Sequence, residues 1–163
     1  MSAGAAIEIP RIDTAAAALH LAEAVRFPTV SLASGGPIDT ASFLGVHQFL
    51  AGRYPAVHAT LSREVVGGLS LLYTWKGSDS TLAPVVLMGH FDVVPVPEPN
   101  LKEWEHPPFS GDTASGFVWG RGTLDDKSTV IAVMPRPPRF MPRHACALPR
   151  ATSGRNRPPP SCP

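Results

Sequence analysis

Apolar residues recur every three or four positions in two stretches near the start of the chain, which is the spacing of an amphipathic helix. The first stretch, Thr14–Arg26, places alanine, leucine and valine side chains on one face. Asp13 or Thr14 can cap this helix, because their side chains accept a hydrogen bond from an unpaired N–H of the first turn. The second stretch has a similar stripe, and we expect its helix to begin at Asp39 or Thr40.

The middle of the chain changes to the pattern of strands. The segment Val57–Val66 is rich in β-branched residues, a Gly-Gly pair follows, and Leu69–Trp75 continues with apolar residues. These two segments are typical of a β-hairpin. Pro84–Met88 (PVVLM) is apolar throughout, which is typical of a strand buried on both faces. A short strand at Phe117–Trp119 and a helix at Lys127–Val133 follow. We therefore expect an α/β fold with a partial mixed sheet flanked by helices.

Composition changes where this pattern ends. Residues 134–163 contain six Arg, both Cys and nine of the chain's 19 Pro, but no Asp or Glu. Residues 1–133 carry 8 Lys and Arg against 13 Asp and Glu, so the formal net charge of +1 describes neither part. Because proline removes a backbone donor and no apolar periodicity remains, we predict a disordered tail at 134–163 beside a folded part at 1–133.

The same composition excludes several classes of protein. No apolar run approaches the roughly 20 residues that span a bilayer, and the N-terminus lacks the basic and apolar regions of a secretory signal. Two Cys without a CxxC spacing do not form a disulfide framework. The acidic body argues against a nucleic-acid surface. We expect a cytoplasmic protein with neither nucleic acid nor membrane as a partner.

Residues with candidate chemistry lie between 85 and 127. His90 and Asp92 follow the predicted buried strand, and the ends of such strands are where α/β sheets bind ligands. Residues i and i+2 of an extended chain point to the same side, so the Asp92 carboxylate can orient the His90 ring for a metal. Asp125 and Asp126 are adjacent, and a cation relieves the repulsion between such carboxylates. One carboxylate can also bridge two metals about 3.5–4 Å apart.

Each of these features has a simpler explanation when it is taken alone. A His after a strand is more often an ordinary hydrogen-bonded residue, and paired acids before a helix are more often caps. Together they lie in three segments: GHFDVVP at Gly89–Pro95, WEHPPFSG at Trp104–Gly111 and VWGRGTLDDK at Val118–Lys127. This combination resembles the co-catalytic zinc metallopeptidases of the M20 family. The likeness is nearest to carboxypeptidase S and the N-acyl amino acid hydrolases, and it covers about residues 10–133, corresponding to the N-terminal part of the family's zinc-peptidase catalytic domain.

The resemblance implies a role for each candidate residue. His90 corresponds to a ligand of one zinc, Asp125 to the carboxylate that bridges two zincs, and Asp92 to the catalytic-site acid that steadies the His90 ring. It also implies a cis peptide between Asp125 and Asp126. The implied reaction is metal-dependent hydrolysis of an amide bond in small peptides or N-acyl amino acids, in which zinc activates a water and a Glu moves its proton.

The sequence lacks the later part of the family's pattern. Asp126 is the last acidic residue of the chain, whereas the family carries a Glu-Glu pair, a further acidic ligand, a distant His and an inserted dimerisation domain. A tight zinc site uses three or four protein ligands, so His90 and Asp125 should bind zinc weakly or partially. We therefore expect a truncated, inactive fragment of an M20 hydrolase, and whether it is an enzyme stays open. Without covering elements, the strand at Val85–Met88 should expose an apolar face or open edge.

Two other interpretations stay open. The chain can be a non-catalytic remnant, or its Pro/Arg tail (PRPPR, Pro135–Arg139) can dock on a groove that recognises polyproline helices. The tail's composition favours G/C-rich codons, so an out-of-frame reading after codon 133 would also explain it. Translating the other two frames of the gene tests this, since an acid-rich stretch with a Glu-Glu pair is then expected. Substrate identity and oligomeric state are not determined by the sequence.

Overall fold

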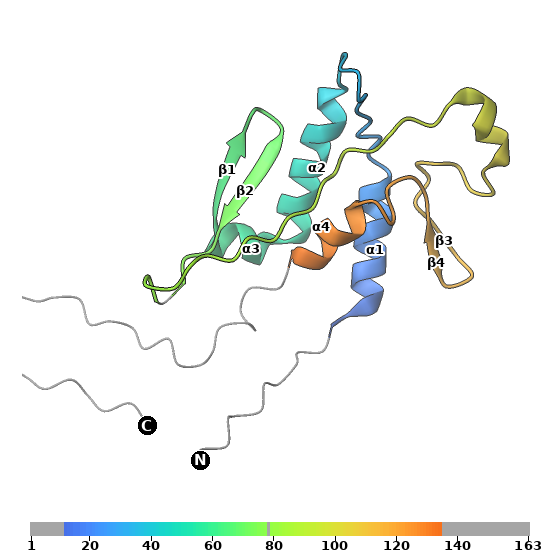
Figure 1. The fold of residues 1–163 in the computed structure, drawn as a ribbon. Helices are drawn as coiled ribbons and strands as arrows, with labels where there is room; N and C mark the ends of the chain where they lie inside the picture. The colour runs from blue at the N-terminus through green and yellow to red at the C-terminus, as the bar shows by residue number, and fades with distance from the viewer. Residues whose placement is uncertain (1–11, 78, 135–163) are drawn as a thin grey trace, which may run out of the picture.

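The computed structural model describes residues 12–77 and 79–134 (Figure 1). Its helices are α1 (Thr14–Val25), α2 (Thr40–Arg53), α3 (Pro55–Thr60), α4 (Lys127–Val133) and a short 3-10 helix, η1 (Glu98–Glu103). Its strands are β1 (Ser62–Val66), β2 (Ser70–Thr74), β3 (Asp112–Ala114) and β4 (Phe117–Trp119). Within the described residues they form two separate antiparallel pairs, β1–β2 and β3–β4, which lie on opposite sides of the helices. The α/β fold class is therefore confirmed.

The two long helices begin where the caps predicted. The Asp13 carboxylate accepts a hydrogen bond of 3.0 Å from the backbone N–H of Ala16 at the start of α1. Asp39 caps α2 in the same way, accepting from the N–H groups of Ala41 and Ser42. Hydrogen bonds from Ser42 also lower the pKa of the Asp39 carboxyl. Local sequence thus sets both helix starts.

The predicted hairpin is present, but its first strand is shorter than expected. β1 and β2 pair antiparallel, with Ser62 opposite Thr74. The beginning of the predicted strand Val57–Val66 belongs instead to α3, so that part of the prediction is wrong. Pro55 occupies the first turn of α3, where its fixed φ suits a helix and its missing N–H costs nothing. This local effect overrides the strand preference of the β-branched residues that follow.

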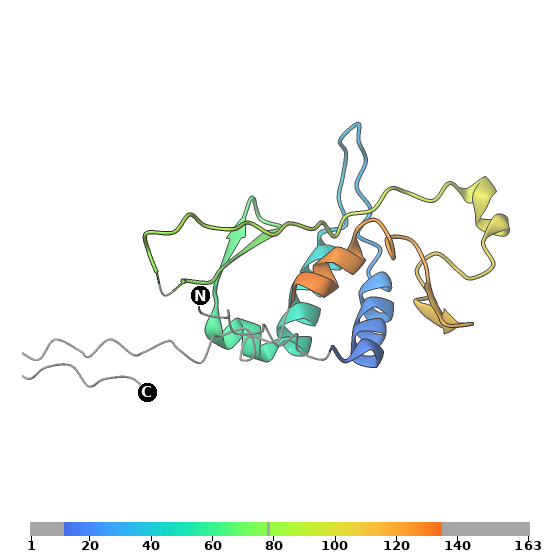
Figure 2. The ribbon, with the colours of Figure 1, turned by 60° about the horizontal axis from the view of Figure 1, so that its bottom comes forward.

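A hydrophobic core lies where α2, α3 and the end of α4 meet. It is formed by the buried side chains of Val46, Leu50, Val57 and Met134, and partly buried side chains from α2, the β1–β2 hairpin and neighbouring loops pack against it. Helix α4 also packs against α1, whose Val25 is fully buried (Figure 2). The site described below is attached to this group of helices. The rest of the predicted tail, 135–163, lies outside the described residues.

The prediction of a buried strand at Pro84–Met88 is wrong. Within the described residues it joins neither sheet, and the side chains of Val85 and Met88 are 85% and 81% exposed. Figure 2 shows it as an extended chain running past α2. A strand that is apolar on both faces needs layers on both sides, and the described residues supply none.

Among the described residues, no helix has both the length and the apolar character that crossing a membrane requires.

Candidate metal centre

Two segments far apart in the sequence are joined at the base of the site. Val30 and Val93 form a parallel bridge, in which Ser31 N–H donates to the Val93 carbonyl at 3.0 Å and Val93 N–H donates to the Thr29 carbonyl at 2.9 Å. The Thr29 hydroxyl adds a hydrogen bond of 2.6 Å to the carbonyl of Phe91. The chain that follows α1 is therefore held alongside the segment that carries His90 and Asp92.

The structure brings the three predicted site residues together. Nδ1 of His90 lies 3.0 Å from the backbone carbonyl oxygen of Asp92 and 3.2 Å from its carboxylate oxygen Oδ1. Nε2 of the same ring lies 3.0 Å from Oδ1 of Asp125, which is 35 residues further along the chain. Each ring nitrogen therefore faces a carboxylate, and the His90 side chain is about half exposed.

Partial burial lowers the pKa of His90, but the surrounding acceptors reverse this effect and the net shift of the pKa is upward. The raising effects are the hydrogen bond to the Asp92 backbone, the hydrogen bond to the Asp125 side chain and the two negative charges. The protonated ring can donate from both nitrogens at once, which satisfies both carboxylates. A divalent cation would supply positive charge at the same place, and it would compete with the proton on Nε2.

Asp126 differs in role from its neighbour. Its Oδ2 accepts a hydrogen bond of 3.3 Å from the backbone N–H of His90, whereas the Asp125 carboxylate faces the ring. The Asp125–Asp126 peptide is cis, as the resemblance implied. The side chain of Asp125 is 91% exposed, so its second oxygen is accessible from solvent.

Lys127 contributes to the site in a way that the sequence did not indicate. Its side chain is buried, and Nζ donates to the carbonyls of Ala24 at 3.0 Å and Phe27 at 2.6 Å. Burial lowers the pKa of this amine to about 8. A Lys at a helix start usually lies in solvent, so no local signal predicts this burial. The contact anchors the Asp125–Asp126 loop to the end of α1.

A hollow in the surface surrounds the candidate ligands. It is lined by His90 and by two segments of the chain, 92–94 and 120–125. The Arg121 guanidinium lies 5.3 Å above the centroid of the Trp104 ring, as in a cation–π contact. The hollow therefore combines acidic, imidazole and guanidinium groups.

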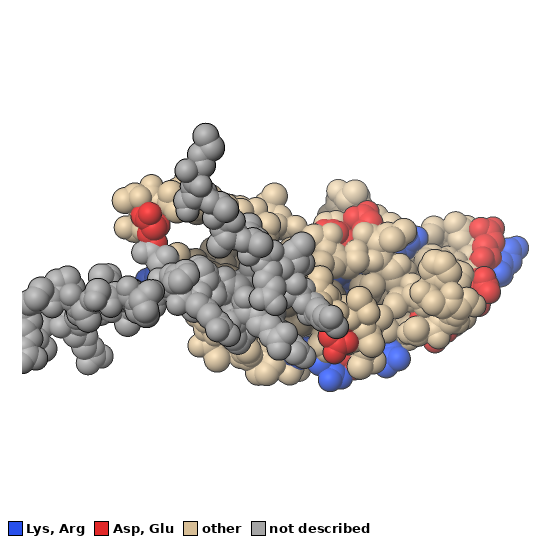
Figure 3. All heavy atoms as spheres, turned by 90° about the horizontal axis from the view of Figure 1, so that it is seen from below, with Lys and Arg blue, Asp and Glu red and all other residues tan. Residues whose placement is uncertain are grey.

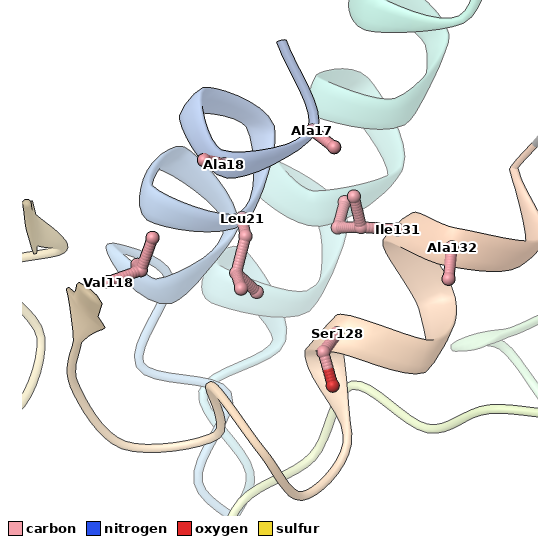
Figure 4. Close-up of a pocket in the computed structure, with 7 residues that line it drawn as sticks. All are labelled: Ala17, Ala18, Leu21, Val118, Ser128, Ile131 and Ala132. Carbon is pink, nitrogen blue, oxygen red and sulfur yellow. The ribbon is translucent and has the colours of Figure 1, made fainter. Parts of the chain in front are cut away.

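A second hollow has a different lining. It lies between α1, α4 and β4, and Ser128 is the one polar residue among those that line it (Figure 4): Ala17, Ala18, Leu21, Val118, Ser128, Ile131 and Ala132. It offers no metal ligand. On the face in Figure 3, the described Lys, Arg, Asp and Glu side chains are scattered in small groups rather than gathered into one basic patch.

The donor set fits part of a metal site. Two ligands of a tetrahedral zinc, each at about 2.0–2.1 Å, lie about 3.3 Å apart. The distance of 3.0 Å between His90 Nε2 and Asp125 Oδ1 is close to this value. Among the residues that the structure describes, no group of three His, Cys, Asp or Glu side chains is placed to hold a metal ion. The pair thus supplies two coordination positions.

Comparison with known proteins identifies the class. Residues 86–135 match the model of peptidase family M20/M25/M40. The chain is 43% identical over 119 residues to the probable carboxypeptidase S-like 2 of Dictyostelium discoideum, covering 72% of this chain and 22% of that protein. It is 44% identical over 119 residues to carboxypeptidase S of Saccharomyces cerevisiae, covering 69% and 21%. For the human N-fatty-acyl-amino acid synthase/hydrolase PM20D1, identity is 42% over 113 residues, covering 68% and 22%.

Over its N-terminal region, the chain is similar to the M20 family of peptidases, a generally metal-dependent family that its motifs also resemble. Its matched relatives include proteins named carboxypeptidase S or carboxypeptidase S-like and proteins named N-fatty-acyl-amino acid synthase/hydrolase, and the match spans about a fifth of their length. No solved structure gives a significant match.

Proposed function

We propose that the chain carries part of the active site of an M20-type hydrolase that cleaves amide bonds in small peptides or N-acyl amino acids, with zinc as its metal. The observation that carries this proposal is the placement of His90, with Nε2 3.0 Å from the Asp125 carboxylate and Nδ1 held by Asp92. The substrate class is supported by the names of the relatives, a carboxypeptidase S and an N-fatty-acyl-amino acid synthase/hydrolase.

Each residue has a distinct part in the proposed chemistry. Bound zinc polarises a carbonyl and lowers the pKa of a water. His90 offers the lone pair of Nε2, and Asp92 keeps the ring oriented by accepting from Nδ1. Asp125 offers one oxygen beside Nε2 and a second oxygen that is free for another ion. We assign His90 and Asp125 as metal ligands and Asp92 as the residue that orients His90.

The 163-residue chain by itself should be a weak metal binder with little or no hydrolytic activity. Two protein ligands are fewer than the three or four of a tight zinc site. The Glu-Glu pair that the resemblance implies has no counterpart after Asp126 in this sequence, so we expect the described site to lack the general base that this pair would supply. Loss of that group costs a factor of roughly 10²–10⁴ in rate. The interpretation of the chain as a non-catalytic remnant stays open beside this proposal.

Calorimetric titration with zinc tests the metal site. We expect the chain to bind zinc in the micromolar range or weaker, and His90→Gln and Asp125→Asn to abolish this binding. Glu64→Gln removes an exposed carboxylate on β1 and is the matched control, which should bind as the original chain does. Binding that is absent in the original chain, or unchanged in both ligand variants, would contradict the proposal.

Hydrolysis of an N-acyl amino acid is measured on the same samples. We expect no zinc-dependent turnover. Tight, stoichiometric zinc binding together with turnover would overturn the view that this chain alone is inactive, while it would support the assignment of the ligands.

A further inference from the structure

The Ser31 hydroxyl makes a contact that neither the motifs nor the family match assigns. Its Oγ donates a hydrogen bond of 2.6 Å to Oδ2 of Asp92, which is 61 residues further along the chain. The other carboxylate oxygen of Asp92 faces Nδ1 of His90. We propose that Ser31 is a positioning residue for His90 and acts through Asp92. This inference rests on the proposed function, in which His90 is a metal ligand.

Backbone contacts hold Ser31 in the register that this hydrogen bond needs. Ser31 N–H donates to the Val93 carbonyl, and Val93 N–H donates to the Thr29 carbonyl. Thr29 is fully buried and Val93 is 4% exposed, so this bridge is shielded from water. The Ser31 side chain therefore arrives beside Asp92 because the bridge fixes both backbones. The hydrogen bond between Ser31 and Asp92 therefore does not require a flexible loop to become ordered first.

The Asp92 carboxylate needs such a restraint. Its side chain is 46% exposed, so water competes for both oxygens. Rotation about the bond to the carboxyl group is soft, because this sp³–sp² torsion has broad minima. With Oδ2 held by Ser31, Oδ1 stays directed at the His90 ring. Removal of the hydroxyl frees the carboxylate to turn towards solvent.

The acceptors that Asp92 offers favour Nδ1 as the ring nitrogen of His90 that carries the proton. Nδ1 has two acceptors from Asp92, its backbone carbonyl at 3.0 Å and Oδ1 at 3.2 Å. The acceptor near Nε2 belongs to Asp125, whose side chain is 91% exposed and free to turn to water. The neutral ring therefore keeps its proton on Nδ1 and leaves the lone pair of Nε2 for a metal. Ser31 strengthens this preference.

Imidazole NMR of the metal-free chain tests the inference directly. Spectra are recorded well above the midpoint of the His90 titration, and His90→Gln assigns the ring signals. We expect the original chain to hold its proton on Nδ1, and Ser31→Ala to shift His90 towards the Nε2–H form. Ser31→Thr keeps the hydroxyl and should restore the original spectrum. Ser34→Ala, on the same exposed loop but bonded at 3.4 Å to Gly35, is the matched control without effect.

Zinc titration of the same variants measures the consequence for binding. Loss of a residue that orients a metal-binding His typically weakens metal affinity about 10–100-fold. We expect Ser31→Ala to weaken zinc binding by a factor near the lower limit, about 10-fold. Ser31→Thr and Ser34→Ala should bind as the original chain does.

The outcomes separate this inference from the proposed function. A His90 spectrum that is the same in Ser31→Ala and in the original chain would overturn the role of Ser31, whether or not zinc binds. Equal zinc affinities in those two proteins would overturn it as well. An original chain that binds no zinc, but whose ring proton moves in Ser31→Ala, would refute the metal site and leave the positioning of His90 by Ser31 supported.

Discussion

Lys127 shows how one buried charge joins distant parts of this chain. Its ammonium group donates to the carbonyls of Ala24 and Phe27, at the end of α1 and just beyond it. Carbonyls at the C-terminal end of a helix lack the usual helical N–H partner, and a cation suits the negative end of the helix dipole. Lys127 also immediately follows the Asp125–Asp126 pair. The same side chain thus caps α1 and fixes the position of the candidate metal ligand.

Burial of Lys127 predicts a particular dependence of stability on pH. Its pKa falls from about 10.5 to about 8 on folding, so the unfolded chain binds the proton more tightly. Between these two values the free energy of unfolding should rise with pH, because the cost of burying the charge is progressively removed. Below the pKa of Lys127 in the folded chain, about 8, the full cost of burying its charge remains.

Urea unfolding at several pH values, for the original chain and Lys127→Met, measures this effect. The rise in the free energy of unfolding between about pH 8 and 10.5 should be smaller or absent in Lys127→Met. Parallel curves for the two proteins over that window would show that Lys127 does not titrate as its burial implies.

At the scale of elements, the connection into β3 depends on a very close approach to α1. A side-chain carbon added at Gly111 would lie 2.0 Å from the carbonyl oxygen of Ala22, and φ of Gly111 is +62°. Beside it, the Arg26 side chain donates a hydrogen bond of 3.0 Å to the Ser110 carbonyl. The β3–β4 hairpin is therefore attached to α1 by backbone contact, which in turn places the loop that carries Asp125.

Gly111→Ala should destabilise the chain by more than the strain of a positive φ alone. That strain is about 1–2 kcal/mol, and displacement of the α1 backbone adds to it. Gly116→Ala is the matched control, because its φ is +81° but nothing lies within 4 Å of the added carbon. Chemical denaturation of both variants should give the larger loss for Gly111→Ala. Equal losses of stability in the two variants would mean that the β3–β4 hairpin can shift against α1 without cost.

At the scale of the whole molecule, the apolar segment 85–88 lies open to water. The side chains of Val86 and Leu87 are 72% and 71% exposed, and Val85 and Met88 are more exposed still. Monomeric proteins rarely leave a continuous apolar run in this state, since it binds other apolar surfaces. Within the described residues, the segment also pairs with no strand. The chain should therefore associate with itself or with apolar probes through this segment.

Leu87→Lys should reduce both forms of association. A charge in the middle of the segment opposes strand pairing and apolar contact. We expect lower fluorescence of the probe ANS and less self-association in sedimentation. Leu101→Lys changes a leucine of η1 that is 46% exposed and outside the segment, and it should have little effect. If both substitutions reduce association equally, the segment has no special part in it.

Features that depend on near neighbours were predictable from the sequence. The caps at Asp13 and Asp39 act within one helical turn, and the hairpin depends on the Gly-Gly pair between its strands. The spacing of His90 and Asp92 likewise predicted that the carboxylate would face the ring. The candidate residues lie close together in the structure, and their roles as ligands stay a prediction.

The sequence by itself named the candidate residues for the chemistry through their motifs. It also determined where most helices and turns begin, because hydrogen bonds over a few positions decide these boundaries. Tertiary structure alone decided the contact of Ser31 with Asp92, 61 residues apart, and that of Lys127 with Ala24, 103 residues apart. It also decided that 85–88 is exposed rather than buried. Burial and long-range contacts depend on which distant segments pack together, and no local pattern of residue types records that.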